Sequence, residues 1–165
     1  NLSIKQLADP GISDAITFQV TSQGLEPRHM ILEITESAAM TDVGRVLENL
    51  TRLRMKGFGL SIDDYGTGYS SMQQLMRIPF TELKIDQSFV MHAAHQDSSR
   101  MILESSLEMA RKLAITSVAE GAETQDDWNL LRECGCDLAQ GFFIARPMDP
   151  ADFPDWVRDW GAPAA

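Results

Sequence analysis

Residues 58–71 of the chain read Phe-Gly-Leu-Ser-Ile-Asp-Asp-Tyr-Gly-Thr-Gly-Tyr-Ser-Ser. The run begins with an apolar stretch that predicts a buried β-strand, and two adjacent carboxylates, Asp63 and Asp64, stand at the end of that stretch. Keeping both carboxylates ionised is costly because they repel each other, unless a cation lies between them. The glycines that follow allow the backbone to turn tightly and to approach a ligand closely. The segment therefore predicts a strand that ends at a site for a hard divalent metal ion.

Strand-like segments alternate with helical patterns on both sides of this run. The expected strands cover residues 2–4, 30–34, 59–62, 82–85, 115–119 and 138–144. The expected helices cover residues 14–23, 43–55, 71–77, 98–113 and 125–134, and a last one contains Phe153, Trp156 and Trp160. Uninterrupted apolar strands that alternate with helices are typical of a parallel sheet covered by helices. The pattern predicts an α/β fold, which could be either a (β/α) barrel or a doubly wound sheet.

The length of the chain bears on the choice of architecture. The chain has 165 residues, enough for one domain with a substantial core, and no linker or low-complexity run divides it. A complete (β/α) barrel takes about 250 residues, so a barrel would lack roughly its first two strands here. The chain also starts abruptly at Asn1 without an initiator methionine. We therefore expect a fragment of a longer protein, incomplete at its N-terminus.

The composition is that of an ordinary globular domain, with 44% hydrophobic and 23% charged residues. A net charge of −10 argues against binding to nucleic acid polymers or anionic membranes, although a bound metal ion could reverse the potential for one small anionic ligand. No apolar run reaches the roughly 18 residues that a membrane span requires. The two cysteines, Cys134 and Cys136, are expected to be reduced thiols rather than a zinc site, which indicates a cytoplasmic location.

Polar side chains recur at the ends of the expected strands, where parallel α/β proteins collect their reacting groups. The set comprises carboxylates, amides and one ammonium: Asn1, Glu36, Asp63, Asp64, Lys84, Glu120 and Gln140. Oxygen ligands of this kind suit Mg²⁺ or Mn²⁺, and the lack of His or Cys at these positions disfavours zinc. The recurrence at successive strands favours one shared site.

Each of these residues also has an ordinary structural explanation. Glu36 could be a surface residue that opens a loop, and Asp63 or Asp64 could cap a turn, although capping needs only one of them. Gln140 could satisfy backbone groups. Lys84 should point away from its strand neighbours into an interior or a cleft, where an ammonium needs a carboxylate partner, so a structural ion pair is its alternative role.

At these residues the sequence resembles the EAL-domain family, the cyclic di-GMP phosphodiesterases. The segments that carry the resemblance are, in order, Asn1-Leu2-Ser3, Glu33-Ile34-Thr35-Glu36-Ser37, residues 63–71, Leu83-Lys84-Ile85-Asp86 with Phe89, residues 119–124, Gln140-Gly141-Phe142 and Arg146-Pro147. Tyr65 stands where the family has Phe, and Ala122 where it has Val. The Glu-Ala-Leu segment that names the family would lie upstream of Asn1. The resemblance implies a TIM-like barrel, with residues 1–165 as the C-terminal two-thirds of an EAL domain.

The resemblance further implies hydrolysis of cyclic di-GMP to linear pGpG, with two Mg²⁺ or Mn²⁺ ions, in bacterial signalling. It assigns metal binding to Asn1, Glu36, Asp63, Asp64 and Glu120, and catalysis to Lys84, Glu120, Asp64 and Gln140. It assigns substrate contacts to Tyr65, Asp86 and Pro147, and supporting roles to Glu33, Glu123, Thr67 and Gly68. A homodimer and a regulatory domain in the same parent chain are also implied.

Two other functions compete with this one. A catalytically inactive EAL-type receptor of cyclic di-GMP would be indicated by degenerate ligand positions, and the positions present in this sequence show no degeneration. An unrelated barrel enzyme that uses Mg²⁺ on a sugar phosphate would fit the strand-end carboxylates but not the ordered motifs. The sequence therefore favours an active phosphodiesterase.

Overall fold

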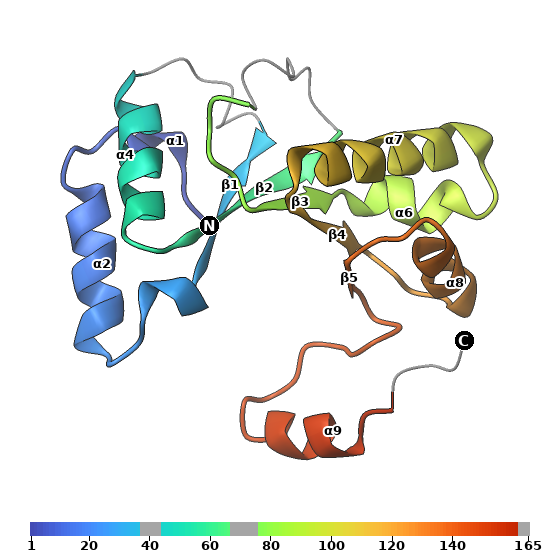
Figure 1. Ribbon diagram of the computed structural model, residues 1–165. Helices are drawn as coiled ribbons and strands as arrows, with labels where there is room; N and C mark the ends of the chain where they lie inside the picture. Colours follow the sequence, from blue (N-terminus) through green and yellow to red (C-terminus); the bar gives the residue numbers. More distant parts are fainter. Residues whose placement is uncertain (37–43, 67–75, 162–165) are drawn as a thin grey trace.

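The computed structural model describes residues 1–36, 44–66 and 76–161. In this part of the chain, five parallel strands form one sheet in the order β1-β2-β3-β4-β5 (Figure 1). Their bounds are β1 (Ile31–Thr35), β2 (Gly59–Tyr65), β3 (Glu82–Ile85), β4 (Thr116–Glu120) and β5 (Leu138–Gln140). Strands that follow one another in the sequence are also neighbours in the sheet, as they are in a (β/α) barrel, whereas a doubly wound sheet reverses its order at a switch point. The strand order therefore favours a (β/α) barrel over a doubly wound sheet.

The strands agree with the sequence pattern except at the N-terminus. The strands predicted from residue 30 onward are confirmed as β1 to β5, although β5 ends at Gln140. The strand predicted at residues 2–4 is wrong, because helix α1 (Ile4–Leu7) begins there. Ser3 caps this helix, since its hydroxyl accepts a hydrogen bond from the Gln6 amide and its own amide donates to the Gln6 side chain. Leu2 still contacts the sheet, because its backbone N–H donates a hydrogen bond of 2.8 Å to the Glu33 carbonyl oxygen.

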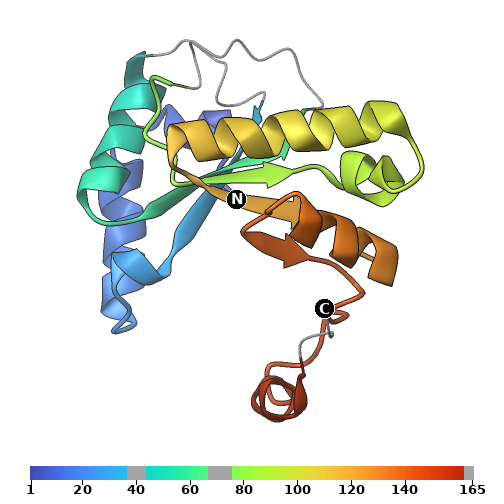
Figure 2. The ribbon, with the colours of Figure 1, turned by 45° about the vertical axis from the view of Figure 1, so that its right-hand side comes forward.

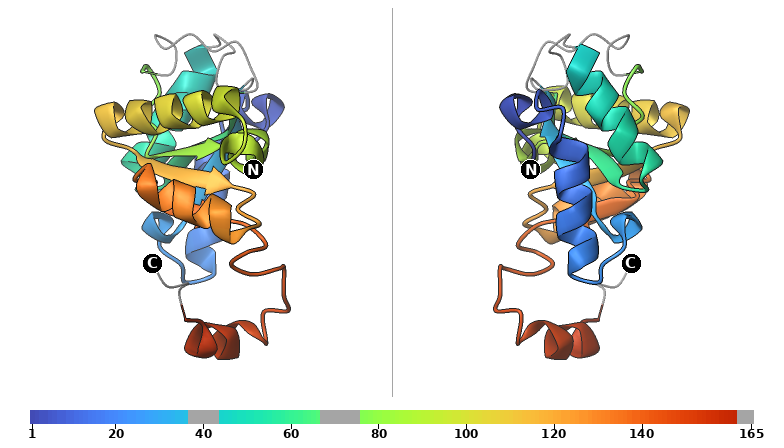
Figure 3. Two further views of the ribbon diagram at one scale, coloured as in Figure 1. Left: turned by 90° about the vertical axis from the view of Figure 1, so that its right-hand side faces the viewer. Right: turned by 90° about the vertical axis from the view of Figure 1, so that its left-hand side faces the viewer.

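The helices pack against the sheet and against each other. The predicted helices are confirmed as α2 (Ile12–Ser22), α4 (Gly44–Met55), α7 (Asp97–Leu113), α8 (Gln125–Glu133) and α9 (Phe153–Asp159), whereas most of the helix predicted at residues 71–77 lies outside the described residues. Helix α6 (Gln87–Ala93) and the 3₁₀ turn η1 (Pro27–His29) were not predicted. Helix α7 runs across one face of the sheet in Figure 2, and α9 stands apart from the sheet in Figure 3. No helix in the described ranges is both long enough and apolar enough to span a bilayer.

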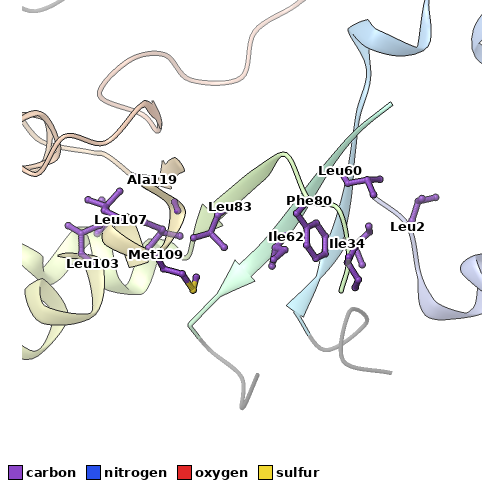
Figure 4. Packing of buried hydrophobic residues seen from close by; sticks show 14 of the residues in the cluster. Leu2, Ile34, Leu60, Ile62, Phe80, Leu83, Leu103, Leu107, Met109 and Ala119 are labelled. Carbon is purple, nitrogen blue, oxygen red and sulfur yellow. The ribbon is translucent and has the colours of Figure 1, made fainter. Parts of the chain in front are cut away.

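The two faces of the sheet differ in character. On one face, buried apolar side chains of the strands, such as Ile62 and Leu83, belong to the same core as Leu103 and Leu107 of helix α7 (Figure 4). Because side chains alternate along a strand, the residues between these apolar ones point to the opposite face. That face borders a cavity of about 490 Å³, whose lining includes Glu33, Glu82, Lys84, Val118 and Gln140. The alternation thus collects the polar residues of several strands on one side of the sheet.

Candidate metal centre

Lys84 of β3 lies at the middle of the polar face, where it is only 7% exposed. Its Nζ lies 2.7 Å from Glu120 Oε1, 2.9 Å from Glu33 Oε1 and 3.0 Å from Asp63 Oδ1. Burial by itself lowers the pKa of Lys84, but the hydrogen bonds to these three carboxylates outweigh it and raise the pKa above its ordinary value. The expectation that a buried ammonium here needs a carboxylate partner is confirmed, and Lys84 is a charged group at neutral pH.

The carboxylates of Asp63 and Asp64 lie on the same side of the sheet because β2 has a bulge at these two residues. In a regular strand, adjacent side chains point to opposite faces. Here the residues before and after the two aspartates pair with the residues before and after Lys84, so two residues of β2 stand opposite one residue of β3. Asp64 adopts a left-handed backbone with φ of 56°, which aspartate visits more readily than most residues other than glycine.

The bulge brings three carboxylates together. Asp63, Asp64 and Glu120 each offer a ligand oxygen, and these oxygens all lie within 4.8 Å of one another. Burial, followed by the charges of Asp63 and Asp86, raises the pKa of Asp64. Burial also raises the pKa of Glu120, although its bond to Lys84 opposes the shift. A divalent cation would relieve this cost, and clustered carboxylate oxygens are the ligands that Mg²⁺, Mn²⁺ and Ca²⁺ prefer.

A cavity of about 290 Å³ opens beside the three carboxylates. Its lining consists of Asp64, Asp86, Gln87, Glu120, Gly121, Glu123, Gln140, Gly141 and Phe142. Gln140 pairs with Glu120 in the register of β4 with β5, and both residues line this cavity. Three of the polar residues that the sequence placed at strand ends, Asp64, Glu120 and Gln140, therefore line one cavity.

The loop that follows Glu120, the last residue of β4, carries Glu123 and is held in place by hydrogen bonds at two points. The N–H of Ala122 donates to the Gln140 carbonyl oxygen at 3.1 Å. The approach is so close that a Cβ atom at Gly141 would lie 2.1 Å from the Ala122 carbonyl oxygen, so only glycine fits there. Farther along the loop, the carboxylate of Asp127, which is 3% exposed, accepts a hydrogen bond from the Glu123 amide at 3.2 Å.

The sequence model of the EAL domain family matches residues 1–147 of the chain. The chain belongs to the EAL-domain family. MucR of Pseudomonas aeruginosa, a bifunctional diguanylate cyclase/cyclic di-GMP phosphodiesterase, is 43% identical over 152 residues, which are 92% of this chain and 22% of MucR. The chain thus spans about a fifth of the length of this relative. The solved MucR phosphodiesterase in complex with c-di-GMP has a TM-score of 0.87 at 42% identity and matches 93% of this chain and 62% of that one.

Two further EAL structures are similar over most of the chain. The EAL domain of Mycobacterium smegmatis DcpA has a TM-score of 0.90 at 32% identity, covering 99% of this chain and 73% of that one. Klebsiella pneumoniae BlrP1, solved with manganese and cyclic di-GMP, has a TM-score of 0.79 at 32% identity, covering 86% of this chain and 36% of that one. A calcium complex of BlrP1 with cyclic di-GMP also matches, with a TM-score of 0.77. The predicted α/β fold of a TIM-like EAL barrel is confirmed.

Some EAL motif positions lie away from the three carboxylates. Glu36 is 3% exposed and stands outside the group; its Oε2 accepts a hydrogen bond from the Gly66 amide at 3.1 Å, which braces the turn after β2. Tyr65 turns to the helical face, where its hydroxyl lies 3.5 Å from the Met109 sulfur. Burial, assisted by the charge of Glu36, raises the pKa of the Tyr65 hydroxyl.

The remaining EAL motif positions lie at the surface or outside the described residues. Asn1 is exposed and lies beside β1, because the next residue bonds to Glu33. Pro147 is exposed and borders none of the cavities described above. Thr67 and Gly68 belong to a range that the structure does not describe. Conversely, Gln87 and Phe142, for which no role was predicted from the sequence, also line the cavity beside the three carboxylates.

Proposed function

We propose that this EAL domain hydrolyses cyclic di-GMP to linear pGpG with divalent metal ions held at the group of Asp63, Asp64 and Glu120. The observation that carries the proposal is the convergence of these carboxylates, from β2 and β4, beside a cavity that Asp64 and Glu120 line. Similarity to MucR and BlrP1, both solved with cyclic di-GMP, supports the choice of substrate.

The ligand set fits a hard divalent cation. Asp63, Asp64 and Glu120 would hold Mg²⁺ or Mn²⁺, and the manganese complex of BlrP1 supports this class of ion. The EAL motifs imply two metal ions and add Asn1 and Glu36 to the ligands. For these two residues, the motif is the only support. When bound, such ions would offset the charge of the phosphodiester and lower the pKa of a coordinated water.

The remaining roles follow from the positions of the side chains around the cavity. Lys84 keeps its proton at neutral pH because its pKa is raised, so it supplies charge and hydrogen bonds to a water or a phosphate oxygen rather than acting as a base. It also fixes Glu120 and Asp63 in place. Gln140 would position water beside Glu120, and Glu33 and Glu123 would support this arrangement. Asp86 at the cavity wall would contact the substrate, whereas the Tyr65 hydroxyl faces Met109. For Pro147, which borders neither cavity, the support for a substrate contact is the EAL motif alone.

A product assay tests the proposal. The full-length protein is incubated with cyclic di-GMP and Mg²⁺ or Mn²⁺, and we expect pGpG by mass spectrometry. Glu120→Gln keeps the size of the side chain but removes its charge, and it should lower turnover by about 100-fold or more. Glu133→Gln, an exposed change at the end of α8, is the matched control and should be as active as the wild type. Binding without product would identify a receptor, and the absence of binding would contradict both functions.

Assembly and context are proposed on the same basis. The chain covers 73% of the DcpA EAL structure, which supports its assignment as the C-terminal two-thirds of the domain. MucR extends well beyond the matched region, which supports a regulatory domain in the parent protein. A homodimer and a cytoplasmic location stay predictions.

A further inference from the structure

The ring of Phe89, in the first turn of helix α6, packs directly against the backbone that follows the bulge of β2. A Cβ atom at Gly66, two residues after Asp64, would lie 2.7 Å from Cε2 and 3.3 Å from Cδ2 of this ring. Packed carbon atoms do not approach each other so closely, so only a glycine backbone fits against the ring. The Asp86 amide also donates a long hydrogen bond of 3.5 Å to the Tyr65 carbonyl oxygen. Phe89 therefore limits how far the end of β2 can move toward α6.

Gln87, in the same helical turn, packs in a similar way against the end of β4. A Cβ atom at Gly121, the residue after Glu120, would lie 2.5 Å from the Cβ and 3.3 Å from the Cα of Gln87. Because β3 lies between β2 and β4 in the sheet, the helical turn that follows β3 stands between the ends of these two strands. One turn of α6 thus touches both the strand that carries Asp63 and Asp64 and the strand that carries Glu120.

Helix α6 is itself held firmly by the core. Val90 and Ala93 of this helix are fully buried and belong to the hydrophobic core, and the helix packs against α7 (Figure 1). Asp86 caps its first turn, since the carboxylate accepts a hydrogen bond of 2.9 Å from the Ser88 amide. A helical turn that is both capped and anchored in the core can fix the positions of the two strand ends that it touches.

We propose that Phe89 and Gln87 are positioning residues that set the spacing between the carboxylates of β2 and the carboxylate of β4, and thereby the size of the metal ion that these carboxylates accept. Mg²⁺ requires oxygen ligands at about 2.0–2.1 Å in near-octahedral geometry, whereas Ca²⁺ accepts about 2.3–2.6 Å and a flexible coordination number. A shift of roughly 0.3 Å at one strand end is therefore enough to change which ion fits. The inference rests on the proposed function and adds the origin of its metal preference.

Calorimetry on the full-length protein, with Mg²⁺ and Ca²⁺ as separate titrants, tests the inference. Phe89→Leu removes the ring that packs on Gly66, so the end of β2 gains room to move. We expect Mg²⁺ binding to weaken about tenfold, as it does when residues that orient metal ligands are lost, and Ca²⁺ binding to weaken by no more than about twofold, because Ca²⁺ tolerates looser geometry. Val90→Ala is the control, because it removes buried methyl groups from the same helix. It should lower the urea midpoint without changing the ratio of the two affinities.

A second pair of variants tests the contact with Gly121 and leaves the ring of Phe89 in place. Gln87→Ala keeps the Cβ atom that meets the glycine, whereas Gln87→Gly removes it. Gln87→Gly should therefore favour Ca²⁺ over Mg²⁺ several-fold more than the wild type does, and Gln87→Ala should keep the wild-type ratio. Because Gln87 is exposed, this pair tests the inference even if Phe89→Leu folds poorly.

The possible outcomes separate this inference from the proposed function. If the wild-type protein binds neither Mg²⁺ nor Ca²⁺, the proposed metal group is wrong and the inference falls with it. If the wild type binds both ions and the affinity ratios of Phe89→Leu and Gln87→Gly equal that of the wild type, the inference is overturned while the proposed function stands. Equal weakening of both ions, or the same change of ratio in Val90→Ala, would also overturn it, because either result would reflect general loosening of the fold rather than ligand spacing.

Discussion

The Nζ of Lys84 lies 2.7 Å from Oε1 of Glu120, so the ammonium rests against a carboxylate that also belongs to the candidate metal group. Asp63 is shared between the ammonium and the metal group in the same way. Lys84 thus acts as a built-in counterion, which reduces the repulsion among the carboxylates whether or not a metal ion is bound.

Replacing Lys84 with methionine should destabilise the metal-free protein. The change leaves Glu33, Asp63 and Glu120 without their common partner, and we expect a loss of roughly 2–4 kcal/mol, because these carboxylates are only partly exposed. Mn²⁺ should restore more stability to Lys84→Met than to the wild type, since the freed carboxylates gain a cation. Urea unfolding in a chelator and in Mn²⁺ measures both effects.

A matched control for this change is Lys112→Met on α7. Lys112 pairs with Glu108 in an exposed ion pair, which contributes at most about 1 kcal/mol and commonly much less. If the chelated Lys84→Met protein unfolds at the same urea concentration as Lys112→Met, the counterion role of Lys84 is wrong.

Asp64→Asn should separate stability from metal binding. The pKa of Asp64 is raised by burial and by the charges of Asp63 and Asp86, so the folded protein loses stability as the pH rises from the ordinary value of 3.8 through the folded pKa. Asparagine removes this cost and tolerates the left-handed backbone. At neutral pH we expect a metal-free variant that is up to about 0.5 kcal/mol more stable, a modest gain because Asp64 is exposed to solvent.

The same variant should bind Mn²⁺ about tenfold or more weakly, because one charged ligand is lost. Urea unfolding in a chelator should show the gain in stability at pH 7 but not well below pH 3.8, where Asp64 is largely protonated in both states. Calorimetry that gives equal Mn²⁺ affinities for the variant and the wild type would remove Asp64 from the ligand set.

The sheet was predictable because its signal is local. The strands β1, β2 and β4 are short and largely apolar, and β3 alternates charged with apolar residues. The predicted helices α4 and α7 each carry an apolar stripe. The first strand failed because residues 2–4 have strand character, whereas the capping of α1 by Ser3 and Gln6 decides the local structure. Helix α6 was missed although Asp86 caps it through the Ser88 amide, because it is short and follows β3 directly.

The site was predictable only as a set of strand ends. Alternation along β3 correctly pointed Lys84 away from its neighbours. It could not show that both Asp63 and Asp64 reach Glu120, because that depends on a bulge set by the pairing of β2 with β3. Nor could it show that Glu33 binds Lys84 or that the Tyr65 hydroxyl faces Met109, since both depend on packing between segments far apart in the sequence.

Gly141→Ala should disrupt the loop that follows Glu120 and carries Glu123. The added Cβ would lie 2.1 Å from the Ala122 carbonyl oxygen, so the backbone of β5 or of the loop must shift. We expect a loss of roughly 2–3 kcal/mol and weaker metal binding. Gly161→Ala is the control, because a Cβ there meets no atom within 4 Å. A Gly141→Ala protein as stable as Gly161→Ala would show that the close contact is not a constraint.

Asp137→Asn should weaken the start of β4 in a pH-dependent way. The Asp137 carboxylate accepts hydrogen bonds from the Ser117 amide at 2.8 Å and from the Ser117 hydroxyl at 2.7 Å. These bonds hold the pKa of Asp137 below its ordinary value of 3.8. The charged form therefore stabilises the fold fully above that value, and the contribution is lost as the pH falls through the lowered pKa.

At pH 7, Asp137→Asn should cost roughly 1 kcal/mol, because the carboxylate is exposed and its bonds are weakened by solvent. The difference from the wild type should shrink in urea unfolding measured at successively lower pH between 5 and 3. Asp155→Asn, which removes a carboxylate from α9, serves as the control and should show no comparable change. A difference between Asp137→Asn and the wild type that stays constant down to pH 3 would mean that the charge of Asp137 does not hold Ser117 in place.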